Sequence, residues 1–122
     1  MEDNKGYKKL KIWIKADELT FEIYKIIKNF PKEEMYGIIS QLRRAAYSVP
    51  LNIVEGHASN SKKEFLNFLN IANRSLVETE YLLELSLKFC YLDKNDYEKL
   101  EGLRQETGRM LNDFMASLKN KL

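Results

Sequence analysis

The residues of this chain that best suit binding chemistry are its clustered lysines and arginines. Such side chains contact phosphate oxygens on nucleic acids, and these contacts do not distinguish one nucleotide sequence from another. The clustered residues are Lys8, Lys9, Lys11, Lys15, Arg43, Arg44, Lys62 and Lys63. Each cluster on its own is more often a solvated or paired helix surface than a phosphate site. A contact with phosphates is the alternative interpretation of each cluster, and all eight residues are candidates for it.

The charge balance limits how such a contact can be built. The 122 residues contain 20 Lys and Arg against 18 Asp and Glu, which gives a formal net charge of +2 and a pI near 8.6. A chain this balanced does not attract a polyanion over its whole surface. Any basic site must therefore be local.

Catalytic and metal-binding patterns are missing from the sequence. His57 is the only histidine, and no glutamate lies three residues before it, which excludes the paired Glu-x-x-His motifs of a di-iron bundle. There is also no Cys-x-x-Cys, no His-Glu-x-x-His and no glycine-rich phosphate loop. We expect a protein that is not an enzyme and that has no metal and no cofactor. His57 is predicted to be a capping or surface residue, with a pH-sensitive contact as the alternative.

A polar stripe surrounds a proline in a segment that otherwise has a helical pattern. Ser48, Asn52 and Glu55 fall at positions i, i+4 and i+7, and Gly56 lies on the apolar stripe beside them. Pro50 costs a helix interior roughly 3 kcal/mol, because it lacks a backbone donor and its ring presses on the preceding turn. We predict a kinked core helix in which Ser48 and Asn52 bond the loosened backbone. Asn52 and Glu55 are expected to hold this helix against the next one.

Apolar residues at spacings of three and four define the elements that position these groups. The pattern predicts four long helices with short connections, over residues 7–28, 32–57, 62–90 and from 94 onward. The fold class is all-α: an up-down antiparallel four-helix bundle whose second helix is kinked at Pro50. Its 44% hydrophobic residues suit a single domain over residues 1–122.

Helix starts and stops carry recognisable signals. Phe30-Pro31 ends the first helix, because the residue before proline is disfavoured in the α region. Ser61 and Glu64 form a capping box at the start of the third helix, and Asp93 is the predicted N-cap of the fourth. The lone Cys90 is expected to be a small buried hydrophobe at the end of the third helix. Within that helix, Arg74 and Glu78 are spaced to form an ion pair.

The sequence offers no signal for a membrane. No run of about 18 uncharged apolar residues occurs, and residues 1–5 lack the apolar core of a signal peptide. We expect a soluble, cytoplasmic protein without a membrane partner.

The sequence resembles a known family of four-helix bundles over nearly its whole length. The family is encoded in intervening sequences of bacterial 23S ribosomal RNA genes. The resemblance is carried by Leu10, Trp13, Ala16, Leu19 and Tyr24, by Phe30-Pro31, by Gln41 to Gly56 including Ser48, Pro50, Asn52, Glu55 and Gly56, by Ser61, Glu64, Phe65, Phe68, Leu69 and Ala72, and by Ser75, Glu78 and Glu80.

The chain departs from the family pattern at three places. Residues 58–60 replace a usual arginine, Arg74 replaces a glycine, and Phe89-Cys90-Tyr91 stands where relatives have Leu-Gly-Tyr. The family is similar to the accessory variability determinant of diversity-generating retroelements. That protein is a homopentameric barrel that associates with a reverse transcriptase and binds nucleic acid.

The resemblance implies an oligomer, most simply a pentameric ring, and it leaves two functions open. In the first, a non-enzymatic ring binds nucleic acid, with structured RNA favoured over DNA, through basic side chains of several subunits. In the second, the chain is a scaffold or accessory subunit for another protein, for example a reverse transcriptase. Aromatic residues exceed what one small core needs, which favours association. They are Trp13, Tyr24, Tyr36, Tyr47, Phe68 and Tyr81.

Overall fold

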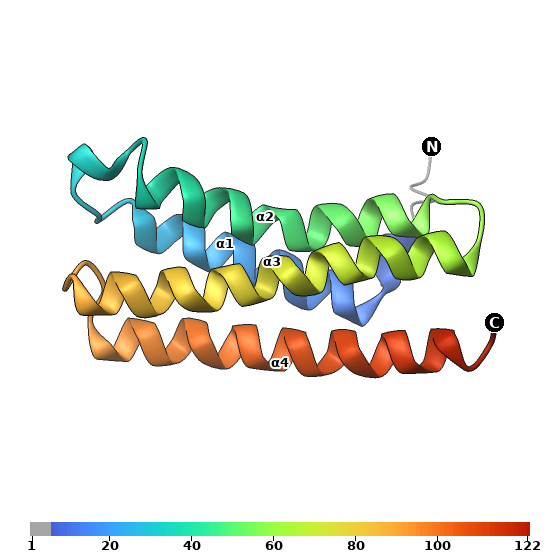
Figure 1. Ribbon diagram of the computed structural model, residues 1–122. Coiled ribbons are helices and arrows are strands. Elements are labelled where there is room, and N and C mark those ends of the chain that lie inside the picture. Colours follow the sequence, from blue (N-terminus) through green and yellow to red (C-terminus); the bar gives the residue numbers. More distant parts are fainter. Residues whose placement is uncertain (1–5) are drawn as a thin grey trace.

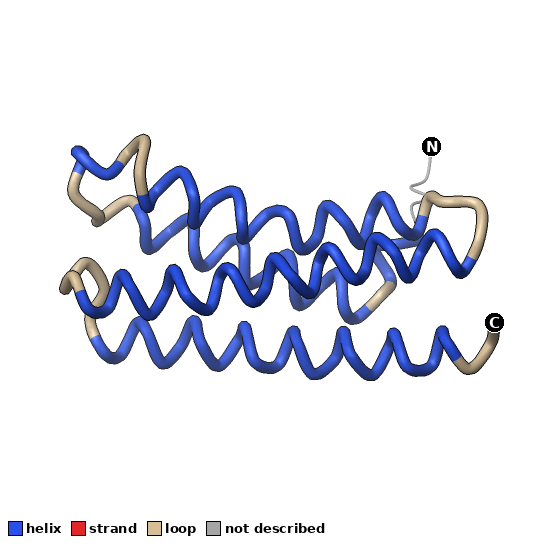
Figure 2. The backbone as a smooth tube through the Cα atoms, viewed as in Figure 1, coloured by secondary structure: helices blue, strands red, loops and turns tan. Residues whose placement is uncertain are grey.

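The structure is a computed structural model that describes residues 6–122. Residues 1–5, on which the argument against a signal peptide rests, lie outside the described residues. All regular elements of the described part are helices (Figure 2). They are the 3-10 turn η1 (Gly6–Lys9), α1 (Lys11–Ile27), the 3-10 turn η2 (Lys32–Glu34), α2 (Ile38–His57), α3 (Lys62–Lys88) and α4 (Lys94–Lys119).

The four long helices form an antiparallel bundle. Figure 1 shows that consecutive helices run in opposite directions, with the connections at alternate ends. Each helix packs against two neighbours, in the order α1–α2–α3–α4 and back to α1. The predicted all-α four-helix bundle is therefore confirmed. No helix between residues 6 and 122 is long and apolar enough to cross a bilayer.

One apolar cluster runs along the centre of the bundle. Its largest fully enclosed side chains recur at helical spacings on the inner faces of all four helices. They include Leu19, Ile23, Leu42, Ile53, Leu69, Leu76, Leu83, Leu100 and Leu111. These residues provide the main hydrophobic stabilisation, at about 25 cal/mol for each Å² of apolar surface removed from water.

The start of the first helix differs from the prediction. We expected one helix from residue 7, but Leu10 is extended (φ −75°, ψ 127°) and separates η1 from α1. Lys8 and Lys9 therefore lie on a separate short turn, whereas Lys11 and Lys15 lie on α1.

The predicted start of the second helix, near residue 32, is also wrong. Gly37 adopts φ −111° and ψ −115°, which is not helical, so α2 begins only at Ile38. The Glu34 side chain reaches forward and accepts a hydrogen bond from the Ile38 N–H at 3.2 Å. Tyr36 consequently lies in the connecting turn and is 94% exposed.

The starts of α3 and α4 agree with the predicted caps. Ser61 Oγ accepts the Glu64 N–H at 3.1 Å, and Glu64 Oε1 accepts the Asn60 N–H at 3.0 Å. Asp93 Oδ1 accepts the Asp96 N–H at 2.8 Å. These bonds satisfy amides that have no partner within the helix, and they fix where each helix starts.

Cys90 contradicts its predicted burial. The last helical residue of α3 is Lys88, and Cys90 is exposed with φ 63°. The Tyr91 N–H bonds back to Ser86 O at 3.0 Å, the pattern of a helix end closed by one left-handed residue. Glycine is favoured at such a position because it has no Cβ. The cysteine thus occupies the left-handed position at which the family pattern has glycine.

Pro50 lies inside α2, which continues through it as a helix. Because proline has no N–H, the Ala46 carbonyl loses the partner it would have within the helix. The Thr20 hydroxyl of α1 lies 3.0 Å from Ala46 O and 2.9 Å from Ala16 O, and its single proton is shared between these two carbonyls. Thr20 therefore supplies part of the donor that Ala46 O lacks. The sequence predicted that Ser48 and Asn52 bond the backbone of this segment, and Asn52 Nδ2 does donate to Ser48 O at 2.7 Å. The contribution of Thr20 was not predicted. The bend at Pro50 itself stays a prediction.

Candidate functional site

Lysines of η1 and of the starts of α1 and α3 lie at one end of the bundle. Lys8, Lys9, Lys11, Lys62 and Lys63 are all exposed, and the segments that carry them lie together at the end that also holds the C-terminus (Figure 1). We call these five residues the basic end.

The starts of α1 and α3 lie beside the C-terminal part of the chain. Lys62 Nζ donates to the backbone carbonyl of Lys121 at 3.2 Å. Lys9 and Lys11 line a cleft together with Asp113 and Phe114 of α4. The exposed Lys119 and Lys121 therefore extend the basic end. Sequence reasoning missed these two, although lysine in the last turn of a helix is itself a favoured pattern.

An aromatic chain holds η1 on the bundle. Tyr7 packs against Trp13 with ring centroids 5.2 Å apart and lies 6.5 Å from the His57 ring. His57 in turn meets Phe65 at 6.2 Å, and a Cβ added at Gly6 would lie only 3.2 Å from the His57 ring. The exposed His57, the last residue of α2, thus helps to position the turn that carries Lys8 and Lys9.

Lys15 is set apart from the other predicted lysines by its partners. Its Nζ lies 3.2 Å from Glu18 Oε1 and 3.4 Å from Glu106 Oε1. The hydrogen bond to Glu18 raises the pKa of Lys15, and the nearby Glu106 charge adds to that effect. Its charge is neutralised locally, so Lys15 is a poor candidate for a phosphate contact.

Arg43 and Arg44 lie on the other half of the bundle. Arg43 lines a cleft together with Tyr24, and Tyr24 follows Lys11 by thirteen residues on α1. That spacing corresponds to about 20 Å along the helix axis. The eight predicted basic residues therefore do not form one surface, because the two arginines are remote from the basic end.

The predicted structural motif divides into buried and exposed members. Asn52 Nδ2 donates to Ser48 O at 2.7 Å and to Ser48 Oγ at 3.0 Å, and Ser75 Oγ of α3 lies 2.8 Å from Ser48 Oγ. Both Asn52 and Ser75 are buried. Glu55 and Glu78 are exposed instead. Arg74 and Glu78 were predicted to form an ion pair, but the ion pairs of residues 6–122 do not include this one.

Gly56 sets the distance between α2 and α3. A Cβ at this position would lie 2.7 Å from Phe65 Cδ1 and 2.9 Å from Phe68 Cβ, both closer than real contacts allow. The two helices can approach this closely only because residue 56 has no side chain.

At the end of the bundle opposite the basic end, Tyr91 and Glu34 form a polar contact. The Tyr91 hydroxyl donates to Glu34 Oε2 at 2.7 Å, while Glu34 Oε1 accepts the Ile38 N–H. The hydrogen bond to the Glu34 carboxylate raises the pKa of Tyr91. This contact links the α1–α2 connection to the end of α3.

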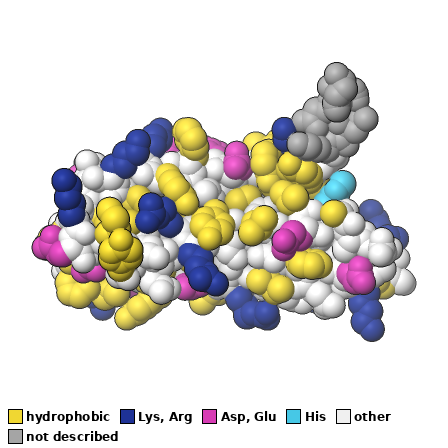
Figure 3. Space-filling view, turned by 90° about the horizontal axis from the view of Figure 1, so that it is seen from above, with side chains coloured by type: hydrophobic (Ala, Val, Ile, Leu, Met, Phe, Trp, Pro, Cys, Tyr) yellow, Lys and Arg dark blue, Asp and Glu magenta, His cyan; other side chains and the backbone are white. Residues whose placement is uncertain are grey.

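Most of the aromatic residues that the sequence suggested were more than one small core needs are exposed. The exposed fractions of Tyr24, Tyr47 and Tyr81 are 37%, 43% and 60%. Phe21 is 68% exposed and lines an open groove between α1 and α2 with Tyr24 and Tyr47. Figure 3 views the molecule from above Figure 1 and shows hydrophobic side chains across the middle of that face, interspersed with lysine and arginine. Trp13 and Phe68 are half-buried.

Comparison with known proteins identifies relatives. The family model for the 23S rRNA-intervening sequence protein matches residues 8–113. The chain is also similar to a crystal structure from Bacteroides thetaiotaomicron, of a protein of unknown function from the S23 ribosomal protein family, at 29% identity and a TM-score of 0.77. The match covers 85% of this chain and 97% of the other. No curated protein sequence matches significantly. With the family model matching from η1 into α4, the chain belongs to the family of 23S rRNA-intervening sequence proteins.

Proposed function

We propose that the protein is a non-enzymatic nucleic-acid-binding protein that contacts phosphates through the basic end. The observation that carries this proposal is the convergence of lysines from η1, from the starts of α1 and α3, and from the end of the chain after α4. Lys9, Lys11 and Lys63 are exposed, and none of them takes part in the ion pairs of the described residues. Such lysines are available to replace the counterions of a phosphate backbone.

Binding of this kind is weak and has little sequence preference. Lysine contacts to phosphates position a nucleic acid, whereas sequence is read by contacts to base edges. The family takes its name from an intervening sequence of 23S rRNA, so a structured rRNA fragment is the first ligand to test. If copies of the chain assemble, several basic ends act on one polyanion, and the effective affinity rises without any new contact.

A salt titration tests the proposal directly. Affinity for duplex DNA, duplex RNA and a structured rRNA fragment should fall steeply as salt rises. The triple variant Lys9→Gln, Lys11→Gln, Lys63→Gln should flatten the slope of log K against log salt by about 0.7 to 0.9 for each lost contact. The matched control is Arg44→Gln, Lys88→Gln, Lys94→Gln, which removes the same charge elsewhere. Equal effects of the two triples, or no binding at low salt, would reject the basic end as the site.

The second candidate function is a protein-interaction scaffold. The observation that favours it is the exposed aromatic groove of Phe21, Tyr24 and Tyr47, because contiguous apolar surface marks interaction sites. Assembly of the chain with itself, as a pentameric ring, belongs to the same proposal. Light scattering at micromolar concentration measures it, and a monodisperse 14.4 kDa species would rule out the ring.

A further inference from the structure

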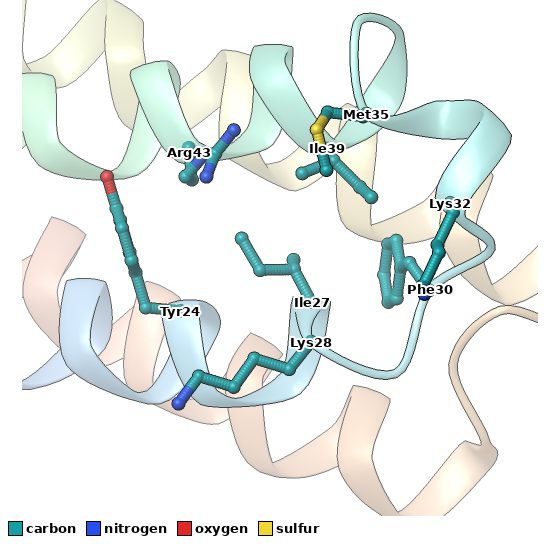
Figure 4. Close-up of a pocket in the computed structure, with 8 residues that line it drawn as sticks. All are labelled: Tyr24, Ile27, Lys28, Phe30, Lys32, Met35, Ile39 and Arg43. Carbon is teal, nitrogen blue, oxygen red and sulfur yellow. The ribbon is translucent and has the colours of Figure 1, made fainter.

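A small cleft lies between α1 and α2 at the end of the bundle opposite the basic end. Its volume is about 280 Å³. Figure 4 shows Ile27 and Ile39 facing each other from the two helices, with Tyr24 at one side and Phe30 at the other. Met35 lies beside Ile39. The floor of the cleft is therefore apolar and built by side chains that the core already holds in place, since Ile27, Phe30 and Ile39 are buried.

The remaining residues that line this cleft are all cationic: Lys28, Lys32 and Arg43. None of the three takes part in the ion pairs of residues 6–122, whereas Lys15, Lys25 and Arg104 are all paired with glutamates. No aspartate or glutamate lines the cleft. The Glu34 carboxylate, which belongs to the same connection, is occupied by the Tyr91 hydroxyl and the Ile38 N–H.

We propose that this cleft binds a small amphipathic carboxylate, with its apolar tail between Ile27 and Ile39 and its carboxylate at Arg43. Ligand sites in proteins are concave and mostly apolar, with a few polar groups that orient the ligand. A guanidinium presents paired N–H donors that match a carboxylate, and the two lysines add favourable charge at the mouth. An uncharged ligand would use the apolar floor but leave the three cations without a partner.

The proposal does not depend on nucleic-acid binding. Tyr24, which lines the cleft with Arg43, lies about 20 Å along α1 from Lys11 of the basic end. The two sites can therefore be tested separately. Loss of phosphate binding through Lys9 and Lys11 would leave the cleft unchanged, and the reverse also holds.

The test is calorimetric titration of the full chain with octanoate. Octan-1-ol, which has the same tail without the charge, and acetate, which has the charge without the tail, are the matched ligands. Octanoate should saturate one site per chain and bind about tenfold more tightly than octan-1-ol. From butanoate to octanoate, each added methylene should tighten binding by about three- to fourfold until the cleft is filled.

Two variants separate the cleft from general surface charge. Arg43→Gln should weaken octanoate binding about tenfold, while Arg44→Gln, which removes the neighbouring exposed arginine, should leave it unchanged. Met35→Trp should fill the cleft and leave the buried side chains of its floor in place, because Met35 itself is 45% exposed.

Three results would overturn the proposal. They are no saturable heat up to about 10 mM octanoate, equal affinity for octanoate and octan-1-ol, and equal losses for Arg43→Gln and Arg44→Gln. An octanoate affinity that weakens as protein concentration rises would assign the cleft to a contact between copies of the chain, and would also overturn it.

Discussion

The contact between α2 and α3 and the polar contacts of α4 use different interactions. Along α2 and α3, a glycine permits close approach, and buried amide and hydroxyl groups bond each other. The polar links of α4 are instead ion pairs with exposed partners, such as Lys99–Glu22 at 3.0 Å and Lys15–Glu106 at 3.4 Å. Buried contacts fail when one atom is added or removed, whereas exposed ion pairs contribute little. The comparison predicts a clear ranking of substitutions.

The largest effect is expected at Gly56. Gly56→Ala places a methyl group against Phe65 and Phe68 and should lower the free energy of unfolding by about 2 to 3 kcal/mol. Gly102→Ala is the matched control, because a Cβ there meets nothing within 4 Å. It should stabilise α4 by about 0.5 to 1 kcal/mol. Denaturant unfolding measures both, and losses of equal size would contradict the close approach of α2 and α3.

Asn52 and Glu55 should differ sharply, although sequence reasoning gave them the same role. Asn52→Ala removes the bonds to Ser48 and should cost about 1 to 2 kcal/mol, because the buried polar groups around it lose a partner. Glu55→Ala should stay within about 0.5 kcal/mol, as is usual for an exposed side chain. A large cost at Glu55 that depends on protein concentration would instead place it in a contact between copies.

Thr20 and Pro50 should be coupled through the Ala46 carbonyl. Thr20→Val removes the only described donor to that oxygen from outside α2 and should cost about 1 kcal/mol. In a Pro50→Ala background, the new N–H of residue 50 can bond Ala46 O, so the same substitution should cost much less. A double-mutant cycle isolates this coupling from other effects of Pro50→Ala. Thr20→Ser, which keeps the hydroxyl, is the control, and strictly additive losses would show that Thr20 does not compensate for the proline.

The fold was predictable from the sequence to the extent that local signals determined it. The leucine spacing and the caps at Ser61 and Asp93 depend on neighbours along the chain, and both agree with the structure. The starts of α1 and α2 were misplaced because Leu10 and Gly37 leave the helical region although neither is a proline or carries a capping side chain of its own. Cys90 was misplaced because a left-handed backbone at a cysteine has no signal in apolar periodicity.

The candidate site was predictable as a set of residues but not as an arrangement. Lysine and arginine clusters are visible in the sequence, yet their grouping depends on which helix ends meet. Pairing of Lys15 with Glu106 depends on how α1 and α4 are rotated about their axes, and no spacing along the chain reports that rotation. The same is true of Thr20, whose partner Ala46 belongs to another helix.

A substitution in the turn between α3 and α4 should stabilise the protein. Cys90→Gly should raise the free energy of unfolding by about 1 kcal/mol, because a left-handed backbone is costly for a residue with a Cβ. Cys90→Ala, which removes the thiol but keeps the Cβ, should give no such gain. Denaturant unfolding of the two variants distinguishes backbone strain from any effect of the thiol itself.

The smallest effect is expected for the ion pair between Glu22 and Lys99. Hydrogen bonds from Lys99 and then Lys25 lower the pKa of Glu22 below its ordinary 4.5. The stabilisation is therefore present above about pH 4.5 and is lost as pH falls through the lower pKa of the folded state. Lys99 is 60% exposed, so the pair should contribute no more than about 0.5 kcal/mol.

A double-mutant cycle of Glu22→Gln and Lys99→Gln at pH 7 and pH 3 measures this contribution. The coupling energy should be small at pH 7, smaller at pH 3 as Glu22 takes up its proton, and smaller again in high salt, because exposed charges are screened. A coupling above about 1 kcal/mol would exceed the range of exposed pairs. It would mean that charge holds α4 as firmly as close packing holds α3, and the contrast between the two regions would fail.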